Sequence, residues 1–325
     1  MRGGRRRVQS CGQASFPPAH TRRRPLAASF APPPSASSRP SDHNHLQNVL
    51  PHSRGLAVLL AMLDTIYICR HGFRMSWVGA ETFLPTGRPR DPVLTAHGQS
   101  QARHLADYFS SFPASERPQL IVSSPYYRCL QTSVPTASAL ELELVAEPGL
   151  AEWFPTVTPR TGVHPSPARA QYMQEFIPQL SLSWTPMLYP DANGESISQL
   201  HARARRVLDL IAQRCEELGV KRVLICSHAA TIIAMGRVLL NDDTDGKRTK
   251  FIGAGTASLS KYVRSNSEGK WTQQLNGDAS FLPGGVEREW HFGMVPDNVN
   301  EDGMGQGWSD PEAPATKPTT MQTKL

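Results

Sequence analysis

The segment Thr65–Gly72 constrains this chain more than any other stretch of similar length. The run Thr65–Ile68 is rich in β-branched residues, which predicts a buried strand, and it leads directly into Cys-Arg-His-Gly. This order places the guanidinium of Arg70 and the imidazole of His71 at the carboxyl edge of a sheet. A neutral imidazole is a nucleophile toward phosphorus, and an arginine holds a phosphoryl group by two parallel hydrogen bonds. The segment predicts a site that attacks an anion, although these residues alone are a weak signal.

Strands and helices alternate along the middle of the chain. The pattern predicts strands at 65–69, 120–123, 143–146 and 222–226, helices from 95, at 126–140, 197–218 and 229–240, and a closing strand pair at 257–263 and 271–275. Such alternation indicates an α/β fold with three α/β/α layers around a mainly parallel, doubly wound sheet. Residues 147–190 are irregular and rich in proline, which predicts a large insertion or lid at the sheet edge.

The two ends of the chain differ in composition from its middle. Residues 1–61 carry nine arginines and one acidic residue, whereas residues 294–325 carry five acidic residues and two lysines. The ends dominate the net charge of +6, so the middle is near neutral and a general nucleic-acid surface is not implied. We predict a disordered Arg/Pro/Ser-rich leader over 1–61, one domain over 62–293 and a disordered polar tail over 294–325.

The leader leaves two interpretations open. Its arginines, serines and scarcity of acid are typical of a mitochondrial presequence, but an extended gene model ahead of a start at Met62 is favoured. The longest apolar run, at 56–63, is too short to span a membrane. The five cysteines form no Cys-x-x-Cys pair, which predicts buried free thiols of an intracellular protein. A cytoplasmic or nuclear location, or both, is therefore expected, and a mitochondrial one only if the leader is a presequence.

Further charged residues follow the other predicted strands. Arg128 lies one turn into the helix after the second strand, Glu152 follows the short third strand, and His228 follows the strand 222–226. Ligands of doubly wound sheets bind outside the carboxyl ends of the strands. Together with Arg70 and His71, these residues predict a phosphate pocket with an acid beside it.

Six short motifs occur in a fixed order. They are Ile68–Gly72, Leu94–Gly98, Ser123–Thr132, Leu150–Glu152, Gly194–Ser196 and Cys226–His228. With these motifs, residues 63–263 resemble the histidine phosphatase superfamily, whose best-known member is the cofactor-dependent phosphoglycerate mutase. More narrowly, residues 62–77 and 276–292 resemble a fungal subgroup that includes the phosphatase-like small subunit of transcription factor IIIC.

The resemblance implies a phosphoglycerate mutase-like fold, a phosphoric monoester hydrolase of the histidine acid phosphatase type, and a role for each residue. His71 attacks the phosphorus and becomes transiently phosphorylated, while Glu152 protonates the leaving oxygen and then activates the hydrolytic water. Arg70 and Arg128 bind the phosphoryl oxygens, and His228 donates a hydrogen bond to the same group. No metal and no other cofactor is expected, because the arginines and histidines supply the charge that a metal would supply.

The sequence departs from the mutase pattern beside both histidines. Mutases continue Arg-His-Gly with Glu-Ser and follow the second histidine with Gly-Asn, whereas this chain has Phe73-Arg74 and Ala229-Ala230. The missing polar groups would orient a small phosphorylated acid, so a phosphatase is favoured over a phosphoglycerate mutase or bisphosphatase. Phosphatase branches often place an arginine at the position of Arg74, which is therefore expected to be a further anion contact.

The sequence does not name the substrate, which is expected to be a phosphorylated small molecule or a phosphoprotein. The alternative function is a phosphatase-like scaffold subunit of a transcription factor IIIC-like complex, which the subgroup resemblance suggests. That alternative predicts protein partners. Neither direct nucleic-acid binding nor membrane binding is expected.

Residues beside the motifs are interpreted structurally. Ser124 and Pro125 are predicted as the cap and first-turn proline of the helix after the second strand, and Ser196 as the cap of the helix that begins at 197. Phe73 and Trp77 can pack either on a bulky substrate or within their own loop. Four histidines outside the motifs are predicted to lie at the surface: His104, His164, His201 and His291.

Overall fold

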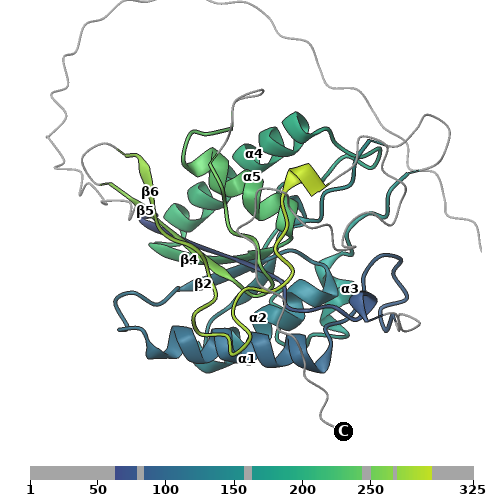
Figure 1. Cartoon of the computed structure of the whole chain (residues 1–325), viewed down its shortest axis with the longest axis horizontal. Helices are drawn as coiled ribbons and strands as arrows, with labels where there is room; N and C mark the ends of the chain where they lie inside the picture. The colour runs from purple at the N-terminus through teal and green to yellow at the C-terminus, as the bar shows by residue number, and fades with distance from the viewer. Residues whose placement is uncertain (1–62, 79–83, 157–162, 244–249, 266–268, 295–325) are drawn as a thin grey trace, which may run out of the picture. The chain divides into compact units, whose positions relative to one another are not determined.

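A six-stranded mixed sheet forms the centre of the fold (Figure 1). Its strands are β1 (Thr65–Arg70), β2 (Leu120–Ser123), β3 (Leu144–Ala146), β4 (Arg222–Ser227), β5 (Leu259–Arg264) and β6 (Trp271–Asp278). They lie in the order β3-β2-β4-β1-β5-β6. The first four are parallel, whereas β5 pairs antiparallel with both β1 and β6. The predicted α/β fold with a mainly parallel sheet is confirmed.

This computed structural model describes residues 63–78, 84–156, 163–243, 250–265 and 269–294, all within the unit Ala57–Leu325. The predicted leader and all but the first residue of the predicted tail lie outside the described residues, so these domain boundaries stay a prediction. In the described part, no helix is long and apolar enough to cross a membrane.

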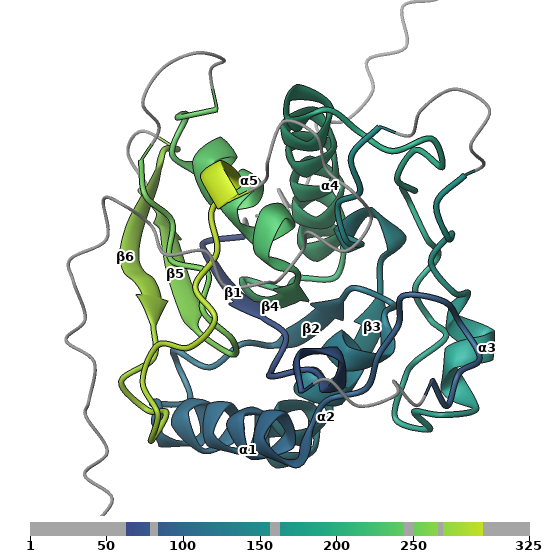
Figure 2. The same cartoon turned by 45° about the vertical axis from the view of Figure 1, so that its right-hand side comes forward.

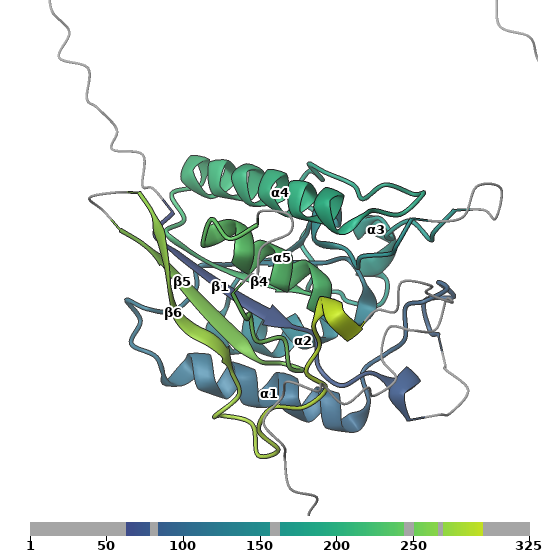
Figure 3. The same cartoon turned by 45° about the horizontal axis from the view of Figure 1, so that its top comes forward.

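Helices cover both faces of the sheet. The α-helices are α1 (Ala96–Ser111), α2 (Tyr127–Leu140), α3 (Ala170–Gln174), α4 (Ile197–Glu217) and α5 (Ala229–Leu239), and the 3-10 helices are η1 (Met75–Trp77), η2 (Pro148–Leu150) and η3 (Phe292–Met294). Figures 2 and 3 show α1 and α2 on one face and α4 and α5 on the other. Short α3 lies beyond the β3 edge, within the proline-rich insertion.

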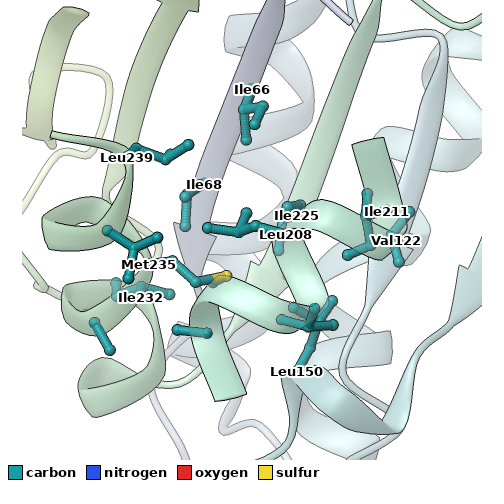
Figure 4. Close-up of a cluster of buried hydrophobic side chains, with 14 of the residues drawn as sticks. Ile66, Ile68, Val122, Leu150, Leu208, Ile211, Ile225, Ile232, Met235 and Leu239 are labelled. Carbon is teal, nitrogen blue, oxygen red and sulfur yellow. The ribbon is translucent and has the colours of Figure 1, made fainter. Parts of the chain in front are cut away.

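Two hydrophobic cores follow from the alternation of side chains along the strands. Ile66 and Ile68 of β1 face α4 and α5, where they pack with residues such as Leu208 and Met235 (Figure 4). Tyr67 belongs to the second core, against α1 and α2. Each fully buried side chain of this size stabilises the fold by about 1.5–3 kcal/mol relative to exposure. The four parallel strands are buried on both faces, which explains why they are almost continuously apolar.

Helix starts agree with the sequence in two cases and differ in one. The Thr95 side chain accepts a hydrogen bond from the Gly98 amide at the start of α1, and Ser196 forms a full capping box with Gln199 at the start of α4. The prediction for α2 is wrong, because Tyr126 occupies the cap position and makes no side-chain capping bond. Ser124 is freed by this arrangement for a contact in the site described below.

The strand register brings the motif residues to one edge of the sheet. Cys69 lies opposite Cys226 in the β1–β4 pair, and the His71 amide donates to the Ser227 carbonyl at 3.0 Å. The Ser124 amide donates to the Cys226 carbonyl at 2.9 Å, so the β2 end joins the same edge. Gly72 is required there because a Cβ on it would stand 2.7 Å from the carbonyl oxygen of Gly98.

Candidate active site

His71 is buried at the end of β1, with 2% of its surface exposed. Its Nδ1 lies 2.8 Å from the Gly72 carbonyl oxygen, which only accepts hydrogen bonds, so Nδ1 carries the proton and Nε2 keeps its lone pair. Burial and the nearby guanidinium of Arg128 hold the pKa of His71 well below its usual range. The ring is therefore neutral and fixed in the tautomer that a nucleophile needs.

Arg128 lies in the first turn of α2 and is 1% exposed. Its Nη1 donates to the Arg90 carbonyl at 3.2 Å and approaches Asp91 Oδ1 at 3.4 Å, while Nη2 lies 3.3 Å from Glu152 Oε2. Its Nε is buried and has no hydrogen-bond partner among the described residues. The guanidinium is thus held at one end and retains a donor for a ligand.

His228 follows β4 and is fully buried. Its Nε2 lies 2.8 Å from Ser124 Oγ, and its Nδ1 lies 3.0 Å from Arg128 Nη2 and 3.3 Å from Glu152 Oε2. Nδ1 therefore faces both Arg128 and Glu152, while the contact of Nε2 with Ser124 orients the ring.

Glu152 follows η2 and is 7% exposed. Burial alone would raise the pKa of its carboxyl, but His228 and the guanidinium of Arg128 outweigh burial and lower the pKa to about 2. The carboxyl is ionised at neutral pH in the free site. A bound phosphoryl dianion would offset the same positive charges and raise the pKa of Glu152 toward the range of a general acid.

Arg70 and Arg74 add two more guanidinia. Arg70 Nη1 donates to the carbonyls of Ala254 and Arg288 at 2.6 and 2.5 Å, and its buried Nε has no hydrogen-bond partner among the described residues. Burial, with a smaller contribution from the charge of Arg128, lowers the pKa of Arg70 to about 10 and that of Arg74 to about 9. Mutual repulsion of this kind favours a bound anion.

An aromatic wall stands beside the nucleophile. Trp77 stacks on His71, with ring centroids 5.9 Å apart, and Phe73 meets Trp77 edge-on at 5.1 Å. The guanidinia of Arg74 and Arg288 lie over the Trp77 ring at 4.7 and 5.5 Å. Phe73 and Trp77 therefore pack on each other and on the site, and Arg288, which the motifs did not indicate, joins it from the segment after β6.

A hollow opens beside the site, and Glu152 is one of its lining residues. Tyr126, Phe154, His164 and Pro165–Pro167 also line it. A second hollow shares Tyr126 and Pro165–Pro167 and reaches Arg88.

One surface prediction is wrong, that for His201, whereas His104, His164 and His291 are half-buried. His164 lies in the pocket wall, stacked on Phe154 at 4.8 Å, with its Nδ1 3.1 Å from Arg90 Nη1. His201 is 7% exposed on the inner side of α4, where its Nδ1 lies 2.7 Å from the Ile197 carbonyl. The aromatic stack of His164 joins residues ten positions apart in an irregular segment, which no periodic pattern reveals.

Three side chains of the site have the ligand types of a metal centre. One potential ligand atom from each of His71, Glu152 and His228 lies within 4.8 Å of the others. The nearby guanidinia of Arg70, Arg74 and Arg128 oppose a cation and favour an anion at this position. The donor set therefore fits a phosphoryl group better than a metal ion.

All six predicted site residues, which are Arg70, His71, Arg74, Arg128, Glu152 and His228, come together at this edge of the sheet. The sequence did not indicate Ser124, Arg288 or the pocket wall as parts of the site. Ser124 lies in the same motif as Arg128, Ser123–Thr132, and this shared motif is the feature of the sequence that could have indicated it as a site residue.

Comparisons with known proteins agree with this geometry. The sequence profile of the histidine phosphatase superfamily (branch 1) matches residues 66–277. The transcription factor tau 55 kDa subunit of Saccharomyces cerevisiae is 30% identical over 296 residues, which cover 81% of this chain and 67% of that protein. The crystal structure of ecdysone phosphate phosphatase from Bombix mori superposes with a TM-score of 0.52 at 17% identity, covering 76% of this chain and 98% of that one. The structure of a mycobacterial glucosyl-3-phosphoglycerate phosphatase in complex with inorganic phosphate superposes with a TM-score of 0.43 at 20% identity. That match covers 67% of this chain and 99% of the other.

Proposed function

The chain belongs to the histidine phosphatase superfamily, and we propose that it hydrolyses phosphomonoesters through a phosphohistidine on His71. One observation carries this proposal. A neutral imidazole with a free Nε2 lone pair stands among guanidinia, two of which, Arg70 and Arg128, keep a buried N–H without a partner among the described residues. An anion with several acceptor oxygens would satisfy these donors and relieve the repulsion between them.

In the first step, the His71 Nε2 lone pair forms a bond to phosphorus while the bond from phosphorus to the ester oxygen breaks. Arg70, Arg74 and Arg128 offset the charge of the equatorial oxygens, which is the main electrostatic contribution in phosphoryl transfer. Glu152 gives its proton to the departing oxygen, so the first product leaves as an alcohol. The Nδ1–H group of His71 keeps its hydrogen bond to the Gly72 carbonyl, and this bond stabilises the phosphorylated ring.

In the second step, the Glu152 carboxylate takes a proton from a water molecule as the water oxygen bonds to phosphorus. The bond between phosphorus and Nε2 breaks, which returns neutral His71 and releases inorganic phosphate. The low pKa of Glu152 in the free site means that the proton for the first step is most available in acid or from the substrate monoanion. An acidic pH optimum follows.

Hydrolysis is favoured over mutase chemistry by the residues around the nucleophile. Phe73 and Trp77 stand where mutases have polar groups, and Trp77 covers one face of the His71 ring. The substrate is a phosphorylated small molecule or a phosphoprotein whose leaving group fits the pocket beside Glu152.

The test is hydrolysis of p-nitrophenyl phosphate by the full chain in EDTA between pH 4 and 8, compared with His71→Ala. We expect activity that survives EDTA and disappears in the variant. His104→Ala, on α1 and without a role in the site, is the matched control and should retain activity. A folded parent without activity on this ester and on a panel of alkyl phosphates would contradict the proposal.

A second function rests on the yeast relative. Because the transcription factor tau 55 kDa subunit is 30% identical over most of this chain, we infer that the chain is also a subunit of a comparable transcription factor and is located in the nucleus. Tagged protein should co-purify with homologues of the other subunits, identified by mass spectrometry, and His71→Ala should co-purify equally well. A chain that runs as a lone monomer in lysate would contradict this second function.

A further inference from the structure

The backbone that carries Glu152 is tied to a buried ion pair beside the site, formed by Glu195 and Arg203. Arg203, on α4, is 6% exposed, and Glu195, just before α4, is 5% exposed. Arg203 Nε donates to both carboxylate oxygens of Glu195, at 2.7 and 3.0 Å. Glu195 is also among the residues that line the pocket beside Glu152. The mechanism above uses neither residue.

The same guanidinium also holds the residues just before Glu152. Arg203 Nη1 donates to the carbonyls of Gly149 and Ala151, at 2.7 and 3.1 Å. The Ala151 carbonyl accepts a further bond from Thr231 Oγ1 at 2.9 Å. The chain on the N-terminal side of Glu152 is thus fixed from α4 and from α5.

The residues just after Glu152 are held from the other end of the ion pair. Trp153 Nε1 donates to the Glu195 carbonyl at 2.7 Å, and the Glu195 amide donates to the Phe154 carbonyl at 2.8 Å. Gly194 permits this contact, since its φ of +83° and its approach to the Pro155 carbonyl both exclude a side chain. The motif Gly194–Ser196 therefore joins the acid loop to the start of α4.

We propose that Arg203 and Glu195 are positioning residues that hold the Glu152 carboxyl at the leaving-group oxygen. The proposal rests on the function proposed above and extends it to a specific step. A general acid must stay within hydrogen-bond reach of the atom that it protonates, and the irregular segment around Glu152 has no regular secondary structure to fix it. The ion pair replaces that missing support, which predicts that its loss impairs proton donation and leaves phosphate binding intact.

Two substrates separate proton donation from the rest of the reaction. Phenyl phosphate needs a proton on its departing oxygen, whereas 2,4-dinitrophenyl phosphate releases a stable anion without one. Because Glu152 also activates water in the second step for both esters, the first step is followed alone, as the single-turnover release of the phenol. In the full chain, Glu152→Gln should slow release from phenyl phosphate by about 100-fold or more. Arg203→Met should slow it by at least about tenfold, with release from the dinitrophenyl ester changed by less than about threefold.

Matched variants guard against a general structural effect. Arg203→Lys keeps the charge but cannot bond the carboxylate and both carbonyls together, so it should show the same selectivity to a smaller degree. Arg205→Met, on the exposed side of the same helix, should leave the ratio of the two substrates unchanged. Equal losses on both substrates by folded Arg203 variants would overturn the proposal.

Hydrogen exchange supplies a readout that does not require turnover. Amides in peptides covering residues 148–154 should exchange faster in Arg203→Lys than in the parent, while peptides of β1 and β4 should be unchanged. If the parent hydrolyses neither ester, the proposed function fails and the exchange data still decide the positioning role. Unchanged exchange over 148–154 would overturn that role even in an active enzyme.

Discussion

The two ends of the candidate site are built in different ways. The phosphate end, defined as Arg70, His71, Arg128 and His228, is carried by strand ends and the first turn of a helix, and each of these side chains is at most 5% exposed. The leaving-group end, defined as Tyr126, Phe154, His164 and Pro165–Pro167, comes mainly from the irregular insertion.

Under the proposed function, this contrast separates the residues of the chemical step from those that select the substrate. The side chains of the phosphate end hold each other and the backbone, so a change in one disturbs the others. The leaving-group end is a wall of rings and prolines beside Glu152, where a change alters the fit of one kind of substrate. The following predictions test this difference, from the largest expected effect to the smallest.

Replacement of Arg128 by alanine is expected to cause the largest effect. It removes a charge from the transition state and leaves the buried carboxylates of Asp91 and Glu152 without their partner, so kcat should fall by about 10³-fold and stability by about 3–5 kcal/mol. Steady-state kinetics and urea unfolding measure the two losses. A variant with near-normal kcat would show that the phosphate end is not the reaction centre.

The pH dependence of the free energy of unfolding should reveal the ionisation of Glu152. The pKa of Glu152 is lowered from 4.5 to about 2 on folding, so its stabilising contribution is present above pH 4.5 and is lost as pH falls toward 2. The contribution at neutral pH is about 3 kcal/mol as an order of magnitude. Urea unfolding at several pH values should therefore give a shallower acid loss for Glu152→Gln than for the parent.

His71 should change the free energy of unfolding in a separate and higher pH range than Glu152 does. Its pKa in the folded chain lies well below the usual 6.5, so the unfolded chain binds the extra proton and stability falls as pH drops below about 6.5. His71→Gln should remove this part of the loss and leave the Glu152 part in place. A parent and variant with identical profiles between pH 7 and 5 would contradict a buried neutral imidazole.

Loss of the Ser124 hydroxyl should have a moderate effect. Ser124→Ala removes the 2.8 Å contact that orients His228, which should lower kcat by about tenfold and leave the fold stable. Ser124→Thr keeps a hydroxyl at the same place and is the matched variant. Equal activity of the alanine variant and the parent would show that Arg128 and Glu152 alone orient the ring.

Changes at the leaving-group end should be small and selective. Phe154→Leu removes the ring that stacks on His164, and it should alter KM for aryl phosphates by about threefold to tenfold while leaving KM for small alkyl phosphates unchanged. A uniform change over the substrate panel would show that this wall does not contact the leaving group.

Much of the phosphate end could be predicted from the sequence, because its residues follow apolar strands at fixed spacings. A strand that ends in Arg-His-Gly and another that ends in Ser-His place their side chains at the same edge whenever the sheet is parallel. The same reasoning could not predict that Pro125 lies outside α2 or that Ser124 bonds His228, since both depend on how the helix packs against β4.

The histidines show the limit of local patterns. His201 is predicted at the surface, yet it is buried on α4, and no local pattern places the half-buried His164 in the pocket wall. Glu195 and Arg203 are eight residues apart in a polar region of the sequence, where a solvent-exposed pair is the ordinary expectation. Their burial follows from the position of α4 over η2, which is a property of the packed helix and not of its sequence neighbours.

The sequence by itself determined the alternation of strands and helices and the residues at the strand ends. These features depend on local periodicity and on short motifs, which a linear chain carries directly. Only the tertiary structure decided which partners lower the pKa of Glu152 and what holds the acid loop. Those features arise from contacts between segments far apart in the chain, and such contacts exist only after both faces of the sheet are buried.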